Sequence, residues 1–205
     1  MQTLEFEKKI LLIGEGSVGK TSLVRRFVID KFDDKYIMTI GTKTSRKPMS
    51  FTFQPEQLQL ELQLDIWDIL GQSGMERAHR VYFKGAEAFI LVFDGTRRDT
   101  FDSLIYWAKT VVELCGSIPG VLAANKVDLR ESFQVTPEEV EAMAKQLNLT
   151  LMYTSAKTGE NVEEAFRKVG NDLCYPLLQK YGGGGQAGAE PAEKDKGKKK
   201  GMFKK

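Results

Sequence analysis

An eight-residue stretch near the start of the sequence, GEGSVGKT at residues 14–21, has the residue types and spacing of a phosphate-binding loop. Glycines let a backbone wrap closely around a phosphate chain, and successive N–H groups then point at its oxygens. Lys20 would add a full positive charge, and the Thr21 hydroxyl would be a ligand of Mg²⁺. A helix that begins near Lys20 would direct the positive end of its dipole at the same place. The alternative is an ordinary glycine-containing turn between a strand and a helix.

Two further loops have the chemistry to select the base of a nucleotide. NKVD, residues 125–128, follows a short apolar strand, and the Asp128 carboxylate could accept two hydrogen bonds from N1–H and the exocyclic amine of guanine. Adenine offers no such pair of donors and would leave Asp128 desolvated and unmatched. TSAK, residues 154–157, follows the next strand, and the Ala156 amide could donate to guanine O6. Three loops in this order predict a guanine nucleotide site.

Strands and helices alternate along the chain, and they must position these loops. Continuous apolar runs predict buried strands at KKILLIG (8–14), AFILVFD (88–94), GVLAAN (120–125) and LTLMYTS (149–155). MSFTF (49–53) and LQLELQLDIW (58–67) alternate with period two around a QPEQ turn, which predicts an antiparallel hairpin.

Apolar residues at helical spacing predict four main helices. The first is KTSLVRRFVID (20–30), with Leu23, Phe27 and Val24 turned inward, and the second is DTFDSLIYWAKTVVELCG (99–116), ended by Gly116. Thr136 and Glu139 form a capping box for a third helix, which ends near Leu147. Asn161 and Glu164 suggest a similar cap for the last helix. Its predicted buried face is Val162, Ala165, Phe166, Val169 and Leu173.

This order of elements predicts an α/β fold: a doubly wound, mostly parallel six-stranded sheet with one antiparallel edge strand from the hairpin. In such a sheet, ligands bind outside the carboxyl ends of the strands. The three candidate loops all follow strands and therefore belong at that edge.

Composition excludes several classes of protein. The 205 residues are 41% hydrophobic and 28% charged, as in an ordinary globular protein. Cys115 and Cys174 have no metal-type spacing and suit a reducing compartment. The N-terminus is too charged for a signal peptide. Gln2 stands where N-myristoylation would need a glycine, so we expect no myristoyl anchor. No run approaches the roughly 20 apolar residues of a membrane helix. We expect a cytoplasmic protein that binds no nucleic acid.

The chain resembles the Ras superfamily of small GTPases, most closely its Rab branch, over residues 6–178. The resemblance depends on GEGSVGKT, YIMTIG, WDILGQ, NKVD and TSAK. It implies the P-loop NTPase fold of a small G protein, GTP or GDP as ligand, Mg²⁺ as cofactor and slow GTP hydrolysis. The expected nucleotide-binding residues are Gly14, Glu15, Gly16, Ser17, Val18, Gly19, Lys20, Thr21, Ser22, Phe32, Tyr36, Thr39, Gly71, Asn125, Lys126, Asp128, Ser155, Ala156 and Lys157.

The resemblance also assigns roles to individual residues. Thr21, Thr39 and Asp68 would hold the metal, and Thr39 lies eighteen residues after Thr21, as in the family. Lys20 and Gln72 would be catalytic, Lys20 as a charge on the phosphates and Gln72 by orienting the attacking water. Phe32 would flank the guanine ring. Gly71 would turn its amide to the γ-phosphate.

Two loops, roughly 33–42 and 68–80, would be ordered by the γ-phosphate and would recruit effectors, exchange factors and GTPase-activating proteins. We expect a monomer. The phosphate-binding loop, residues 14–21, contains no arginine, which favours slow intrinsic GTP hydrolysis. His79 is interpreted as a surface residue of the second loop. Trp67 and Tyr82 match two of three aromatic residues with which Rab proteins contact effectors, while Thr44 replaces the third.

Ile69 and Leu70 stand where the family has Thr-Ala. Our hypothesis is that the bulk of Leu70 slows hydrolysis or biases the second loop. An alternative function is therefore a guanine-nucleotide-binding interaction module that hydrolyses weakly or not at all. A second alternative, an ATP-using P-loop enzyme, is disfavoured by NKVD and TSAK.

Residues 1–181 are interpreted as the G domain and residues 182–205 as a flexible Gly-rich, then Lys-rich tail. The tail has seven lysines and three acidic residues but no cysteine for a prenyl group. Weak adsorption to anionic membranes is one interpretation of these lysines, and a solvated tail is the alternative.

Overall fold

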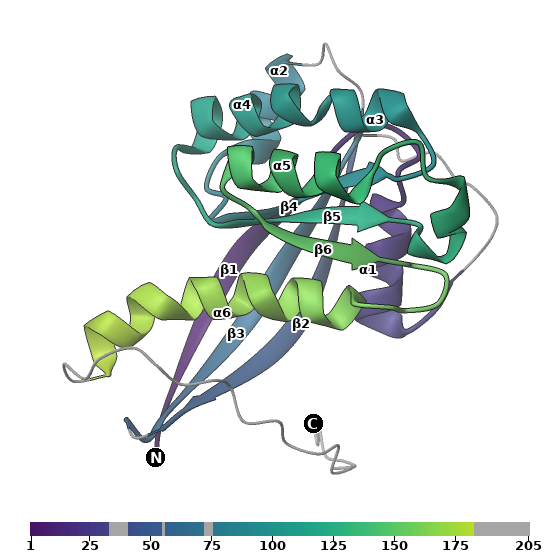
Figure 1. Cartoon of the computed structure of the whole chain (residues 1–205). Helices are drawn as coiled ribbons and strands as arrows, with labels where there is room; N and C mark the ends of the chain where they lie inside the picture. Colours follow the sequence, from purple (N-terminus) through teal and green to yellow (C-terminus); the bar gives the residue numbers. More distant parts are fainter. Residues whose placement is uncertain (33–40, 55, 72–75, 183–205) are drawn as a thin grey trace, which may run out of the picture.

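The computed structural model describes residues 1–32, 41–54, 56–71 and 76–182. Its centre is a six-stranded sheet in the order β2-β3-β1-β4-β5-β6 (Figure 1). All neighbouring strands are parallel except β2 and β3, so the predicted antiparallel edge strand is confirmed. The strands are β1 (Gln2–Ile13), β2 (Thr42–Phe53), β3 (Leu58–Ile69), β4 (Ala88–Asp94), β5 (Gly120–Asn125) and β6 (Thr150–Thr154).

Helices cover both faces of the sheet, and each face has its own hydrophobic core. One face packs against α1 (Lys20–Ile29) and α6 (Val162–Tyr181). The other packs against α2 (Glu76–Phe83), α3 (Arg98–Asp102), α4 (Leu104–Cys115) and α5 (Pro137–Leu147) (Figure 1). A short 3₁₀ helix, η1 (Val127–Ser132), follows β5. None of the helices in the described ranges is long and apolar enough to cross a membrane.

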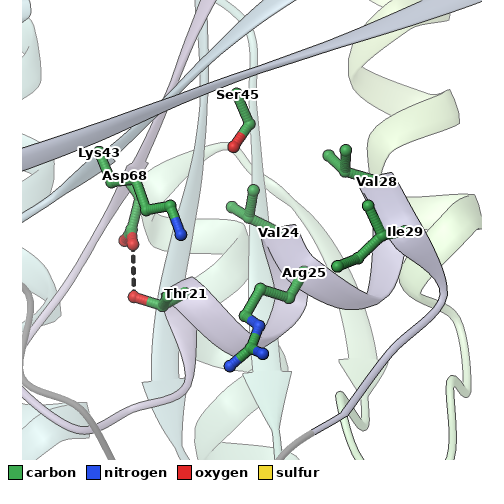
Figure 2. A pocket seen from close by; sticks show the side chains of 8 residues that line it. All are labelled: Thr21, Val24, Arg25, Val28, Ile29, Lys43, Ser45 and Asp68. Carbon is green, nitrogen blue, oxygen red and sulfur yellow. Dashed lines mark hydrogen bonds between the residues drawn. The ribbon is translucent and has the colours of Figure 1, made fainter.

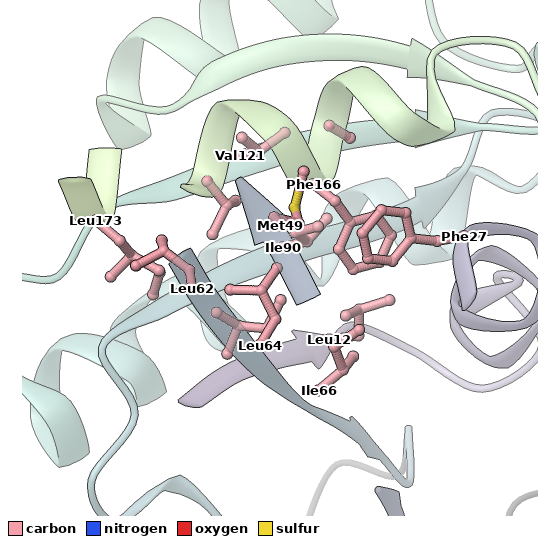
Figure 3. Close-up of a cluster of buried hydrophobic side chains, with 14 of the residues drawn as sticks. Leu12, Phe27, Met49, Leu62, Leu64, Ile66, Ile90, Val121, Phe166 and Leu173 are labelled. Atoms are coloured by element: carbon pink, nitrogen blue, oxygen red, sulfur yellow. The ribbon is translucent and has the colours of Figure 1, made fainter. Parts of the chain in front are cut away.

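The core between α1, α6 and the sheet fixes the direction of α1 (Figure 3). The rings of Phe27 and Phe166 stack with centroids 3.9 Å apart. Leu23, Val24 and Phe27 are buried, as their spacing predicts. Because this face of α1 is anchored, its N-terminus is held just after β1 and beside the neighbouring strand ends.

Three strands extend beyond the rest of the sheet, and the sequence prediction was too short for two of them. β1 begins at Gln2 rather than residue 8, and β2 at Thr42 rather than residue 49. β1 stays in register with β3 from Gln2 opposite Leu58 to Leu12 opposite Asp68. In Figure 1 this three-stranded extension runs along α6 toward the N-terminus. The extra residues were missed because charged and polar side chains occupy its solvent-facing side.

The single helix predicted over 99–116 is wrong, because two helices, α3 and α4, meet at Ser103. The Ser103 hydroxyl donates to the Thr100 carbonyl at 2.9 Å, and such bonds compete with the helical ladder. Thr100 is itself tied to the end of β4, since the Asp94 amide donates to its hydroxyl at 3.1 Å. The break therefore keeps α3 close to the carboxyl end of the sheet.

The two predicted helix caps have different outcomes. The Thr136 capping box is present, with the Glu139 amide 3.3 Å from the Thr136 hydroxyl and the Thr136 amide 2.8 Å from the Glu139 carboxylate. The Asn161 side-chain cap is wrong. Asn161 has a left-handed backbone and donates its side-chain amide to the Tyr153 carbonyl at 2.8 Å, so it joins α6 to β6 instead.

Candidate nucleotide-binding site

The loop from residue 14 to residue 19 turns sharply between β1 and α1. Gly14 and Gly19 have φ of 130° and 99°, and Ser17 has φ of 65°. A Cβ at Gly14 would overlap the Val92 carbonyl, and one at Gly19 would overlap the Asn125 side chain. These two glycines are therefore required by both conformation and packing. The loop delivers Lys20, Thr21 and the half-buried Ser22 at the N-terminus of α1.

Lys20 lies in the centre of this loop and is only 6% exposed. Its ammonium donates to the carbonyls of Gly14 at 2.7 Å and Glu15 at 2.6 Å. Burial lowers the pKa of Lys20 to about 8, although the carboxylates of Asp68 and Glu15 act in the opposite direction. The Lys20 ammonium is therefore a buried cation, and a negatively charged group bound next to it would stabilise its charged form.

Oxygen donors of the kind that Mg²⁺ prefers meet at the first turn of α1 and the end of β3. The Thr21 hydroxyl donates to the buried Asp68 carboxylate. Both side chains line a cavity of about 420 Å³ between α1 and the strands (Figure 2). Mg²⁺ is typically held by one or two protein oxygens together with waters and phosphates, so these donors fit it. The other lining residues are Val24, Arg25, Val28, Ile29, Lys43 and Ser45.

The two candidate base-selecting loops lie next to each other at the ends of β5 and β6. Ser155 donates from its hydroxyl to the Asp128 carboxylate at 2.6 Å, and accepts from the Thr158 amide at 3.1 Å. Asp128 is exposed, while Ser155 and Ala156 are buried. This arrangement orients the carboxylate and leaves its edge accessible from solvent.

Asn125 joins the loops that follow β5 and β6 to the loop around Lys20. Its side-chain amide donates to the Val18 carbonyl at 2.8 Å, and its oxygen accepts from the Thr154 hydroxyl at 3.2 Å. Arg26 adds a second connection, because its guanidinium donates to the carbonyls of Ala156 at 3.0 Å and Lys157 at 2.6 Å. All three predicted loops are therefore fastened together at one edge of the sheet.

Three residues that the sequence analysis missed support these loops. Asp94, fully buried at the end of β4, pairs with the Lys126 ammonium at 2.5 Å. Arg97 donates to the Gly16 carbonyl at 2.9 Å, and the Trp107 indole donates to the Glu15 carboxylate at 3.1 Å. A polar residue ending an apolar strand was a usable signal for Asp94. Nothing in the sequence pattern pointed to the other two.

Gly71 follows β3 and packs directly on the Lys20 loop. A Cβ at Gly71 would overlap the Glu15 carbonyl and the Lys20 ammonium. Ile69 is 1% exposed and belongs to the core under α2, whereas Leu70 is half-buried and donates its amide to the Gly41 carbonyl at 3.0 Å. The two residues that depart from the family pattern thus have different environments.

The prediction that His79 is a surface residue is wrong. It is 2% exposed, and its ring lies 5.5 Å from that of Phe83 and 5.2 Å from that of Trp107. His79 lies on the face of α2 that packs on α4, so its polarity misled the prediction.

Phe32 is half-buried and packs at the edge of the core beneath α1. Trp67 and Thr44 are opposite each other on β3 and β2, with the Lys9 ammonium 3.7 Å from the Trp67 ring centroid. Tyr36, Thr39 and Gln72 lie outside the described residues.

Comparison with known proteins agrees with this geometry. The sequence pattern of the Ras family matches residues 9–175. Human Ras-related protein Rab-8B is 33% identical over 192 residues, which cover 92% of this chain and 88% of Rab-8B. Ras-related protein Rab-13 of Mesocricetus auratus is 34% identical over 179 residues, covering 85% of this chain and 82% of Rab-13. The chain therefore belongs to the Ras family and is a Rab-like small GTPase.

Proposed function

We propose that this chain is a switch that binds GDP and GTP together with Mg²⁺ and hydrolyses GTP slowly. The observation that carries the proposal is the pair of bonds made by Asn125, which fastens the base-selecting loops to the Lys20 loop. A nucleotide has a base and a phosphate chain at a fixed separation. A site for it must therefore hold both recognition elements rigidly with respect to each other.

Each part of the site has a distinct task in this proposal. Asp128, oriented by Ser155, reads the guanine edge. Lys20 and the backbone N–H groups of the loop neutralise the β- and γ-phosphates. Thr21, Thr39 and Asp68 would hold Mg²⁺, which would reduce the negative charge of the phosphates. Gly71 would donate its amide to the γ-phosphate, and Gln72 would orient the attacking water.

The division into a G domain over residues 1–181 and a tail over 182–205 stays part of the proposal. So does the contact of the Lys-rich tail with anionic membranes, which favours a peripheral location at a membrane surface. The relationship to Rab-8B and Rab-13 supports effectors and regulators as partners in general. Their recruitment through the segments around 33–42 and 68–80 is part of the proposal.

The experiment is calorimetry of the nucleotide-free protein with GDP and with ADP in the presence of Mg²⁺. We expect tight GDP binding, no measurable ADP binding, and weaker GDP binding when EDTA removes the metal. Asp128→Asn should weaken GDP binding by at least roughly 100-fold, because it replaces an acceptor of two hydrogen bonds by an amide. Glu131→Gln, an exposed residue on the same short helix, is the matched control and should bind GDP normally.

Folded protein that gives no heat with GDP and Mg²⁺ would contradict the proposal. Equal binding of ADP and GDP would instead identify an ATP-type P-loop protein. Within residues 1–32, 41–54, 56–71 and 76–182, the bond from the Leu70 amide to the Gly41 carbonyl does not distinguish a slow from a very weak hydrolase. The weakly hydrolysing alternative therefore stays a prediction.

A further inference from the structure

We propose that Arg97 is a catalytic residue that the chain supplies to its own site, where its guanidinium contacts the γ-phosphate of GTP. The inference rests on the proposed GTPase function and adds to it. Arg97 lies at the start of α3, eighty-one residues after Gly16 in the chain, and donates to the Gly16 carbonyl at 2.9 Å. The phosphate-binding loop itself contains no arginine, but the fold brings Arg97 from a distant part of the chain into contact with it.

Gly16, whose carbonyl accepts the bond from Arg97, lies at the end of the phosphate-binding loop that faces Gly71. A Cβ built on Gly16 would lie 3.2 Å from the Gly71 carbonyl, so the two glycines face each other. Gly71 also borders the Lys20 ammonium and the Glu15 carbonyl. In the proposed function, Gly71 and Lys20 both contact the γ-phosphate. The Arg97 guanidinium is consequently held at the γ-phosphate end of the loop, not at the end nearest the base.

Asp99 holds the guanidinium in this place. Its carboxylate pairs with Arg97 Nη2 at 2.6 Å, while Nη1 donates to Gly16. A guanidinium has five N–H donors in one plane, which is more than these two bonds use. The side chain is 39% exposed, so the guanidinium can turn without unpacking the core.

The chemistry explains why a cation is valuable at this position. In hydrolysis, a water oxygen forms a bond to the γ-phosphorus while the bond from that phosphorus to the β–γ bridging oxygen breaks. The bridging oxygen keeps the electron pair and leaves with GDP, and the water protons pass to phosphate and solvent. Negative charge builds up on the γ- and bridging oxygens, and a guanidinium beside them stabilises the transition state more than the ground state.

The magnitude stays within the range of a slow switch. G proteins with an arginine in the same chain hydrolyse GTP at about 10⁻² s⁻¹, roughly 20- to 30-fold faster than small GTPases that depend on a partner's arginine. We expect the wild-type rate to be of this order and Arg97→Ala to lower it by roughly 20-fold. A purely structural role for Arg97, fastening the loop to α3, would instead weaken GDP binding and leave the hydrolysis step unchanged.

The test compares wild type, Arg97→Ala and Arg97→Lys, with Arg98→Ala as the matched control. Arg98 is exposed and pairs with Asp102 and Glu139, away from the loop. GDP affinity and thermal stability are measured first, then single-turnover phosphate release, and then binding of aluminium fluoride to the GDP complex. Aluminium fluoride with GDP mimics the charge of the transition state, so its binding reports the arginine independently of turnover.

We expect similar GDP affinity for all four proteins. Wild type and Arg98→Ala should bind aluminium fluoride without a partner, whereas Arg97→Ala and Arg97→Lys should not, since an ammonium lacks the planar set of donors. Wild-type hydrolysis or fluoride binding in Arg97→Ala would overturn the inference, and so would a wild-type protein that binds GDP but not the fluoride complex. If Arg97→Ala fails to fold, Arg97→Lys decides by the same criteria. Loss of GDP binding in every protein would refute the proposed function instead.

Discussion

Lys20 combines three properties that are rarely found in one side chain. It is buried, it is positively charged near neutral pH, and it donates to two carbonyls of its own loop. Burial lowers its pKa to about 8, which is close enough to physiological pH for its charge to vary in ordinary experiments. This makes the residue a reporter of nucleotide binding.

GDP affinity should therefore fall as the pH rises from 7.5 to 9. Phosphate oxygens stabilise the ammonium and raise its pKa in the complex, so between the two pKa values binding takes up a proton. Affinity then falls by up to about tenfold per pH unit, while below pH 7 Lys20 contributes no pH dependence. Calorimetry in two buffers of different ionisation enthalpy measures the proton uptake directly.

Lys20→Arg provides the control for this pH dependence, because a guanidinium stays charged throughout the range. Its affinity should be lower at every pH but should lose the slope. Lys145→Met, on the exposed side of α5, should keep it. A slope that persists in Lys20→Arg would assign the proton to another group.

The predictability of individual residues depended on whether their neighbours were close in sequence. Lys20, Thr21 and Asp128 belong to short motifs in which residue type and spacing indicate the chemistry. The sequence alone was therefore enough to predict them as candidate site residues. Arg97 and Trp107 reach the loop across 81 and 92 residues, and no local pattern reveals such a bond. His79 was misjudged for the same reason, since helix packing buries it.

At the scale of elements, the start of α5 is fixed by a cap and by an ion pair to a neighbouring helix. α5 begins with Pro137 after the Thr136 capping box, and the Glu139 carboxylate also pairs with Arg98 at 2.7 Å. This contact joins α5 to α3, the helix that follows Arg97. The capping box thus stabilises the start of a helix that is joined to α3.

Thr136→Ala should destabilise the protein by about 1 kcal/mol, because the Glu139 amide loses its acceptor. For a domain of this size the melting temperature should fall by roughly 2–4 °C. Thermal unfolding followed by circular dichroism checks the value. Gln146→Ala, an exposed change at the other end of α5, should leave the melting temperature unchanged. An equal shift in both variants would mean that the box contributes nothing specific.

Element types were more predictable than element boundaries. Apolar periodicity correctly identified β4, β5, α1 and α5, since each buries one continuous face or both faces. Ser103 was not recognised as a break because its effect depends on a single hydroxyl bond to Thr100. Asn161 has the right residue type for a cap, but the Tyr153 carbonyl competes for its side chain.

Across the whole molecule, α6 covers the three-stranded extension from β6 outward. Phe51 on β2 is 1% exposed and lies against Gly170, while the Arg167 guanidinium lies 5.8 Å from the ring centroid. Farther along, the rings of Phe6 and Tyr181 are 5.7 Å apart. Glycine at position 170 therefore lets a helix approach a β-strand closely enough to bury an aromatic ring.

Gly170→Ala should destabilise the protein by about 1–2 kcal/mol. A methyl group at this position would overlap the Phe51 ring, and overpacking of this kind typically costs about 1–3 kcal/mol. The higher helix propensity of alanine offsets at most about 1 kcal/mol of this cost. Urea unfolding of the single and double variants with Phe51→Leu measures the coupling. A net stabilisation by Gly170→Ala alone would show that the ring has room to move.

The seam between α6 and the extension also sets the order of events during synthesis. Strands β1 to β3 are complete by residue 69, but the helix that covers their apolar side begins only at residue 162. Contacts of such large sequence separation form late and slow folding. A nascent chain therefore exposes the apolar side of β1, β2 and β3 until α6 has been translated. During this interval the protein most needs protection from aggregation.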